Sequence, residues 1–211
     1  MHQGDNSISI IMYRISKDAE KQLQNSLKSI LSDLSKEQFV PLFYTILKEL
    51  VINACKANQK RVFFEERGYN IFEEQDYSKG IIDYKKSFSE KMSEEYGIKS
   101  RKKGYYCLVK IDYHEEGITF CVENNTPIIK QEEESIREKL EKAMQYDDIA
   151  QFYMDNSEES EGAGLGLALV VILIKGEGID PKYFRISNKD GMTIARLEVP
   201  FTPEFISKRY N

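Results

Sequence analysis

Tryptophan is absent from this chain of 211 residues, and histidine, cysteine and proline are scarce, with 2, 3 and 5 copies. The cysteines, Cys55, Cys107 and Cys121, are odd in number and widely spaced, which argues against a disulfide framework or a structural zinc site. The most apolar run, residues 165–174, is too short to cross a bilayer, and the polar start lacks a signal-peptide core. We therefore expect a cytoplasmic protein with reduced thiols and no membrane insertion.

Excess positive charge is also lacking. The chain has 30 lysines and arginines against 35 acidic residues, a formal net charge of -5, and no long basic run. Proteins that track a nucleic-acid backbone need a basic surface, so we expect no nucleic-acid partner. With 41% hydrophobic and 31% charged residues, the composition is ordinary for a globular domain.

Hydrophobic periodicity predicts a chain of alternating helices and strands. The expected helices cover 17–34, 41–67, 130–143 and 165–174, and the expected strands cover 7–15, 105–113, 117–122, 182–187 and 192–199. Residues 69–100 are polar and tyrosine-rich, and we interpret them as an insertion with one helix at 84–96. Residues 145–164 are acidic and loop-like. This order predicts a two-layer α/β sandwich with a mixed sheet and helices on one face.

The chain divides into an N-terminal strand and helix (1–37), a main domain (38–203) and a C-terminal tail (204–211). Five apolar residues of the first helix fall on one face, namely Leu23, Leu27, Ile30, Leu31 and Leu34. This stripe either packs on the domain's own core or forms a homodimer. The pattern does not choose between these two alternatives.

Two segments carry the chemistry. On the helix 41–67, Glu49, Asn53 and Lys56 are spaced i, i+4 and i+7 and therefore point to one side. An amide oxygen suits magnesium, an ammonium group suits phosphate, and a carboxylate can orient water or accept a proton. The same triplet is also compatible with a solvated helix face.

The second segment, 162–170, has glycines at Gly162, Gly164 and Gly166 immediately before an apolar helix. Glycines let the backbone approach a ligand closely, and the N–H groups of a helix N-terminus attract anions. The spacing matches neither a P-loop nor a dinucleotide fingerprint. A flexible turn before a core helix is the alternative reading.

Together, the two segments resemble the GHKL ATPase superfamily, and in particular the histidine kinase-like ATPase domain. Residues 49–57 resemble its N box, 162–170 its G2 box, Phe152-Tyr153 its F box, and 192–200 its G3 strand. The resemblance implies the Bergerat fold, ATP and Mg²⁺ as ligands, and a lid at about 130–161. It implies roles for these residues: Glu49 as the catalytic residue, Asn53 on magnesium and ATP, and Lys56, Gly162, Gly164, Leu165, Gly166, Leu167 and Thr193 on ATP.

The G1 turn departs from the family's pattern. Asn124 stands where the family has the Asp that accepts the adenine amino group, and Thr126 and Ile128 replace glycines. An Asn oxygen can accept the same hydrogen bond, so Asn124 is our expected adenine partner.

The chain has no histidine in the helix 17–34, because its two histidines are His2 and His114. A self-phosphorylating kinase of the usual plan is therefore not encoded here. Lys56 and the letters of the G2 segment resemble the kinase branch of the superfamily. The expectation is a stand-alone signalling kinase that transfers phosphate from Mg-ATP to a separate partner protein, and the alternative is a non-enzymatic, nucleotide-binding or regulatory module.

Overall fold

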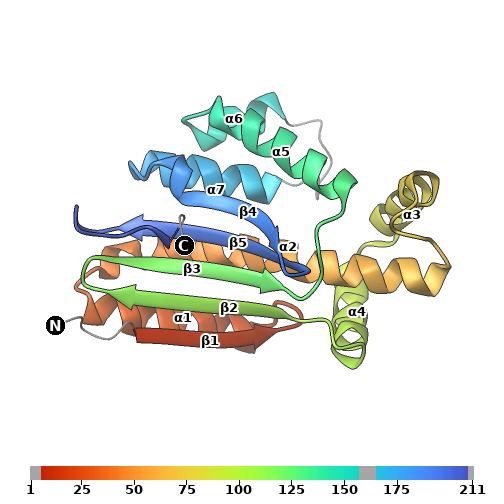
Figure 1. Cartoon of the computed structure of the whole chain (residues 1–211), viewed down its shortest axis with the longest axis horizontal. Coiled ribbons are helices and arrows are strands. Elements are labelled where there is room, and N and C mark those ends of the chain that lie inside the picture. The colour runs from red at the N-terminus through yellow and green to blue at the C-terminus, as the bar shows by residue number, and fades with distance from the viewer. Residues whose placement is uncertain (1–5, 157–164, 209–211) are drawn as a thin grey trace.

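The computed structural model describes residues 6–156 and 165–208 and consists of two layers, a five-stranded sheet and the helices that cover one of its faces (Figure 1). The strands are β1 (Asn6–Met12), β2 (Cys107–His114), β3 (Gly117–Asn124), β4 (Phe184–Lys189) and β5 (Met192–Pro200). The α-helices are α1 (Lys17–Asp33), α2 (Val40–Arg67), α3 (Glu74–Ser87), α4 (Glu90–Lys102), α5 (Lys130–Met144), α6 (Ile149–Asp155) and α7 (Leu165–Gly176). The expected two-layer α/β sandwich is confirmed.

The expectation of a mixed sheet is wrong for the described strands. The strand order is β1-β2-β3-β5-β4, and each neighbouring pair is antiparallel. The reason lies in the last hairpin. β4 forms the outer edge, and the turn at Asp190 and Gly191, both with positive φ, reverses the chain so that β5 enters between β4 and β3.

The apolar stripe of α1 packs on the protein's own core. Leu23, Leu27, Ile30 and Leu31 are at most 1% exposed and belong to one cluster with α2, α7 and the sheet. β1 pairs with β2 along its whole length. These side chains are buried within one chain, which favours the first alternative, packing on the protein's own core.

Helix α2 is the long central element, and it begins with Pro41 in its first turn and ends at Gly68, whose φ is +72°. Its first half packs on the sheet, whereas its second half extends beyond the sheet to the insertion (Figure 1). There, Val62, Phe63 and Phe64 form a second apolar cluster with Tyr84, Met92 and Tyr96.

The insertion contains two helices instead of the one expected at 84–96. The chain leaves α3 at Phe88, and the side chain of Ser89 then accepts a hydrogen bond from the N–H of Met92 and caps α4. The stretch 145–164, expected to be a loop, contains α6, where Asp148 caps the helix in the same way.

The three cysteines are buried and free, as expected. Within the described part of the chain, no helix is both long and apolar enough to cross a membrane.

Candidate functional site

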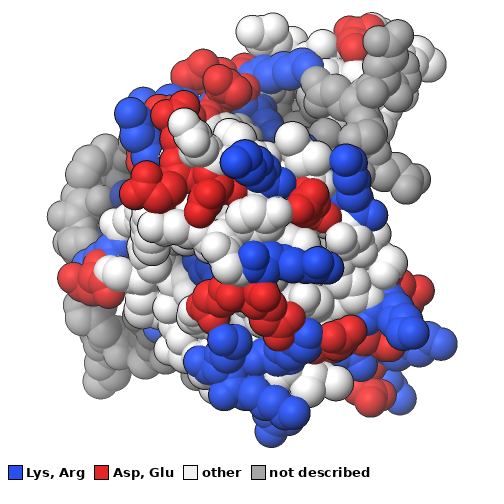
Figure 2. Space-filling model, turned by 90° about the vertical axis from the view of Figure 1, so that its right-hand side faces the viewer, with Lys and Arg blue, Asp and Glu red and all other residues white. Residues whose placement is uncertain are grey.

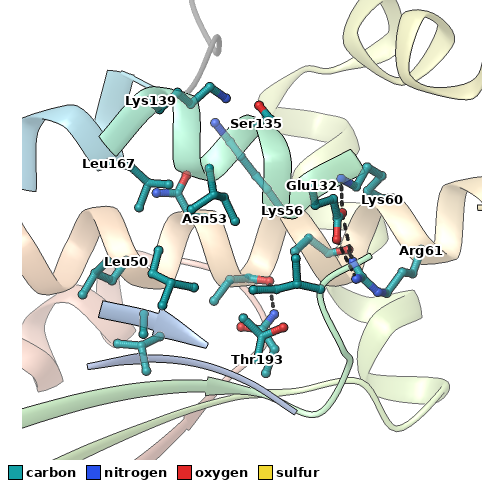
Figure 3. A pocket seen from close by; sticks show the side chains of 18 of the residues that line it. Leu50, Asn53, Lys56, Lys60, Arg61, Glu132, Ser135, Lys139, Leu167 and Thr193 are labelled. Atoms are coloured by element: carbon teal, nitrogen blue, oxygen red, sulfur yellow. Dashed lines mark hydrogen bonds and ion pairs between the residues drawn. The ribbon is translucent and has the colours of Figure 1, made fainter. Parts of the chain in front are cut away.

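A pocket of about 300 Å³ opens beside the middle of α2, between the end of β3 and helices α3 and α5. Five residues predicted from the sequence line it, and they come from four elements that are far apart in the chain (Figure 3). These are Asn53 and Lys56 on α2, Asn124 on β3, Leu167 on α7, and Thr193 on β5. The tertiary structure therefore brings together residues from separate segments that the sequence had linked to one another only by resemblance.

Asn53 and Lys56 share the face of α2 that their spacing predicted. The Nδ2 atom of Asn53 is buried and has no hydrogen-bond partner in the described structure. A buried, unpaired amide is costly unless something satisfies it, and its O and N atoms can exchange places by a flip. The Nζ atom of Lys56 lies 4.8 Å from the centre of the Phe88 ring, next to the end of α3.

Glu49 does not line the pocket, although it lies one turn from Asn53. Its side chain is held against the start of α7. A Cβ atom on Gly166 would be 2.2 Å from Glu49 Oε2 and 3.5 Å from Asn53 Nδ2. The absence of a side chain at Gly166 therefore leaves room for the Glu49 carboxylate, which lies at the margin of the site.

Asn124 is fixed from the side of α2. Its Nδ2 atom donates to the carbonyl oxygen of Ala54 at 2.7 Å and to Asn58 Oδ1 at 3.1 Å. Thr126 donates to the same Asn58 oxygen at 3.1 Å, and Thr193 donates to the carbonyl oxygen of Thr126 at 2.7 Å. Asn124 Oδ1 accepts no hydrogen bond within the described chain, so it is the atom that could receive a ligand's amino group.

Sequence reasoning missed a buried charge network at the other end of the pocket. Glu132 on α5 forms ion pairs with Lys60 and with Arg61 (3.0 Å), and Arg61 also donates to the carbonyl oxygens of Ala57 and Pro127 (Figure 3). Burial opposes ionisation of Glu132, but the two cations outweigh it and lower its pKa. Lys60 could have been found from the sequence. It lies four residues after Lys56 and so continues the helix face that carries Glu49, Asn53 and Lys56.

The insertion also lines the pocket. The sequence alone did not show whether this segment lies near the site. Tyr77, Ile81, Tyr84 and Lys85 of α3 form one wall. Burial, together with the charge of Glu132, raises the pKa of Tyr77 to about 12. Burial likewise raises the pKa of Tyr84, whose hydroxyl donates to the carbonyl oxygen of Lys56 at 3.3 Å. Both phenols therefore stay neutral at physiological pH.

The expected lid begins with α5, which packs along α7 and contributes Ser135, Ile136 and Lys139 to the pocket. Of the glycine segment, Gly162 and Gly164 lie outside the described residues. Leu165 is half-buried but does not line the pocket.

The donor set fits magnesium held mainly by a ligand's phosphates. No group of three or more His, Cys, Asp or Glu residues in the described chain is placed to hold a metal ion. Magnesium usually keeps waters and takes only one or two protein ligands beside phosphate oxygens. With its amide flipped, Asn53 would place its oxygen at this buried, unpaired position and could serve as such a single protein ligand.

No protein-family model matches this chain, and no solved structure matches it. An uncharacterized protein of Treponema pallidum (strain Nichols) is 28% identical to it over 193 residues, which is 92% of this chain and 37% of that protein. The chain thus spans little more than a third of that relative's length.

Proposed function

We propose that this chain binds Mg-ATP in the pocket beside α2 and transfers phosphate to a separate protein, in the manner of a histidine kinase-like ATPase domain. One observation carries the proposal. Asn53, Lys56, Asn124, Leu167 and Thr193, picked out from separate segments by their resemblance to that superfamily, line one pocket. Its volume, about 300 Å³, lies at the lower end of the range typical of ligand sites.

The residues present supply complementary contacts for a nucleotide. Asn124 Oδ1 would accept the adenine amino group, and Val122, Ile186 and Ala195 would provide apolar surface around it. Asn53 would hold magnesium, and Lys56 would offset phosphate charge. Bound magnesium would neutralise charge that develops on the transferred phosphoryl group, since such transfer depends mainly on positioning and electrostatics.

A second candidate is nucleotide binding without phosphate transfer. The specific observation in its favour is the position of Glu49, the expected catalytic carboxylate, which lies against Gly166 and outside the pocket lining. In this case the chain would act as a regulatory module whose shape depends on bound ATP.

A thermal melt with and without Mg-ATP tests binding. Ligand at about 100 times its dissociation constant adds about 2.7 kcal/mol, which corresponds to a shift of about 5–10 °C for a chain of this size. We expect a magnesium-dependent shift in wild type and in Asn25→Ala, an exposed asparagine on α1, but not in Asn53→Ala. No shift in wild type at any concentration would overturn the proposal.

Incubation with γ-phosphate-labelled ATP and cell extract separates the two candidates. Label on an extract protein that depends on wild-type chain and disappears with Glu49→Gln supports phosphate transfer. A retained melt shift without any labelled protein favours the regulatory module.

A further inference from the structure

Lysines line the pocket from three helices, and two of them have no acidic partner among residues 6–156 and 165–208. Lys56 of α2 and Lys85 of α3 form no ion pair with any described residue, whereas Lys60 is paired with Glu132. The Lys56 side chain reaches Phe88, at the end of α3 where Lys85 also lies. Two unpaired ammonium groups at one rim of a cavity favour a polyanionic ligand.

This charge is a property of the pocket and not of a broad basic surface. Figure 2 looks onto the end of the molecule that carries α3 and α4 and shows basic and acidic side chains interspersed. Lys139 of α5 also lines the pocket (Figure 3). The charge of Lys85 acts within the site, because it contributes to the lowered pKa of Lys60, where burial is the main cause.

Helix α3 is seated firmly enough to position Lys85. Gly80 lies so close to the Phe64 ring that a Cβ atom there would be 2.6 Å from its Cζ atom. Phe64 also packs on Tyr77, with ring centres 5.9 Å apart, and Tyr84 packs edge-on against Phe63 at 5.5 Å. Helix α3 therefore forms one wall of the pocket, and its packing on Phe63 and Phe64 fixes it to α2.

We propose that the insertion 69–100 is part of the ligand site, and that Lys85 together with Lys56 binds the phosphates of a polyphosphate ligand. The proposal deepens the ATP-binding proposal by naming an additional phosphate-binding residue, but its chemistry requires only a chain of phosphates. A nucleoside triphosphate and inorganic polyphosphate share that chemistry, and the experiment distinguishes them.

Calorimetric titration of the whole chain with Mg-ATP and, separately, with inorganic tripolyphosphate tests this inference. The variants are Lys85→Ala and the control Lys86→Ala, which removes the same charge from the next residue of α3 outside the pocket lining. Both lysines are exposed, so neither change should disturb folding. We expect Lys85→Ala to weaken binding about tenfold and Lys86→Ala to change it less than about twofold.

The outcomes separate the two proposals. If wild type binds ATP and Lys85→Ala binds it equally well, the role of Lys85 is overturned while ATP binding stands. If wild type binds tripolyphosphate through Lys85 but does not bind ATP, the phosphate site stands and the nucleotide proposal fails. If wild type binds neither compound, both proposals fail.

Discussion

The amide nitrogen of Asn124, at the end of β3, donates a hydrogen bond of 2.7 Å to the carbonyl oxygen of Ala54 on α2. A second bond from the same nitrogen reaches Asn58 Oδ1 at 3.1 Å. Residue 124 therefore needs a donor facing α2, which an amide has and a carboxylate lacks. This explains how an Asn fits where the resembled superfamily has an Asp.

The first prediction concerns this donor. Asn124→Asp would place a carboxylate against two acceptors in a position that is 2% exposed. We expect it to lower the free energy of unfolding by about 1–3 kcal/mol, because the buried carboxylate would face two acceptor oxygens without a proton to donate to either. Urea denaturation measures the change. The control is Asn125→Asp at the half-buried neighbouring position. It keeps the oxygen that accepts from the Tyr106 N–H and loses a single donated bond, to the carbonyl oxygen of Gly104, so it should cost less. Equal losses in both variants would contradict the argument.

The second prediction concerns the ion pairs of Glu132. Removing the charge in Glu132→Gln leaves Lys60 and Arg61 without a counter-ion in a buried site and should cost about 3 kcal/mol at pH 7. The exposed control Glu133→Gln, which removes an ion pair with Arg137, should cost less than about 1 kcal/mol.

The difference between wild type and Glu132→Gln should depend on pH. The pKa of Glu132 is lowered in the folded state, so its contribution is fully present above the unfolded value of about 4.3. It is lost as pH falls through the lower, folded value. Unfolding free energies measured from pH 7 to pH 3 should therefore converge for the two proteins. A constant difference over this range would show that Glu132 acts through packing rather than charge.

The third prediction concerns the contact between α7 and α2. In Gly166→Ala the new methyl group would meet Glu49 Oε2, the mobile end of a side chain, so the carboxylate should move rather than the helix. Alanine also favours a helix over glycine by about 1 kcal/mol. We expect an unchanged or slightly higher melting temperature together with reduced phosphate transfer. A large drop in melting temperature would show that the carboxylate cannot move.

The fourth prediction concerns the apolar face of α1. Leu27 is 0% exposed, so Leu27→Ala should destabilise the fold by about 2–5 kcal/mol. It should leave the oligomeric state in size-exclusion chromatography unchanged, since this residue packs within one chain. The exposed neighbour in Lys28→Ala serves as the matched control. A change of oligomeric state in Leu27→Ala without loss of stability would contradict the structure.

Local patterns in the sequence predicted most elements correctly. The stripe at Leu23, Leu27 and Leu31 predicted a helix, and Gly68 marked the end of α2. The spacing of Asn53 and Lys56 correctly placed both side chains on one face, because helical geometry alone decides which residues of a helix point together. These features depend on a few consecutive turns and need no knowledge of the rest of the chain.

Contacts between distant segments were decided only by the tertiary structure. Glu132 on α5 could be recognised as a polar helix position, but the sequence could not show that it faces Lys60 and Arg61. The antiparallel arrangement and the position of Tyr77 and Lys85 in the pocket wall were equally hidden. The physical reason is that the residues of α2 become buried or paired according to which other elements pack against them. A sequence pattern shows which residues share one face of a helix, but it does not show what that face contacts.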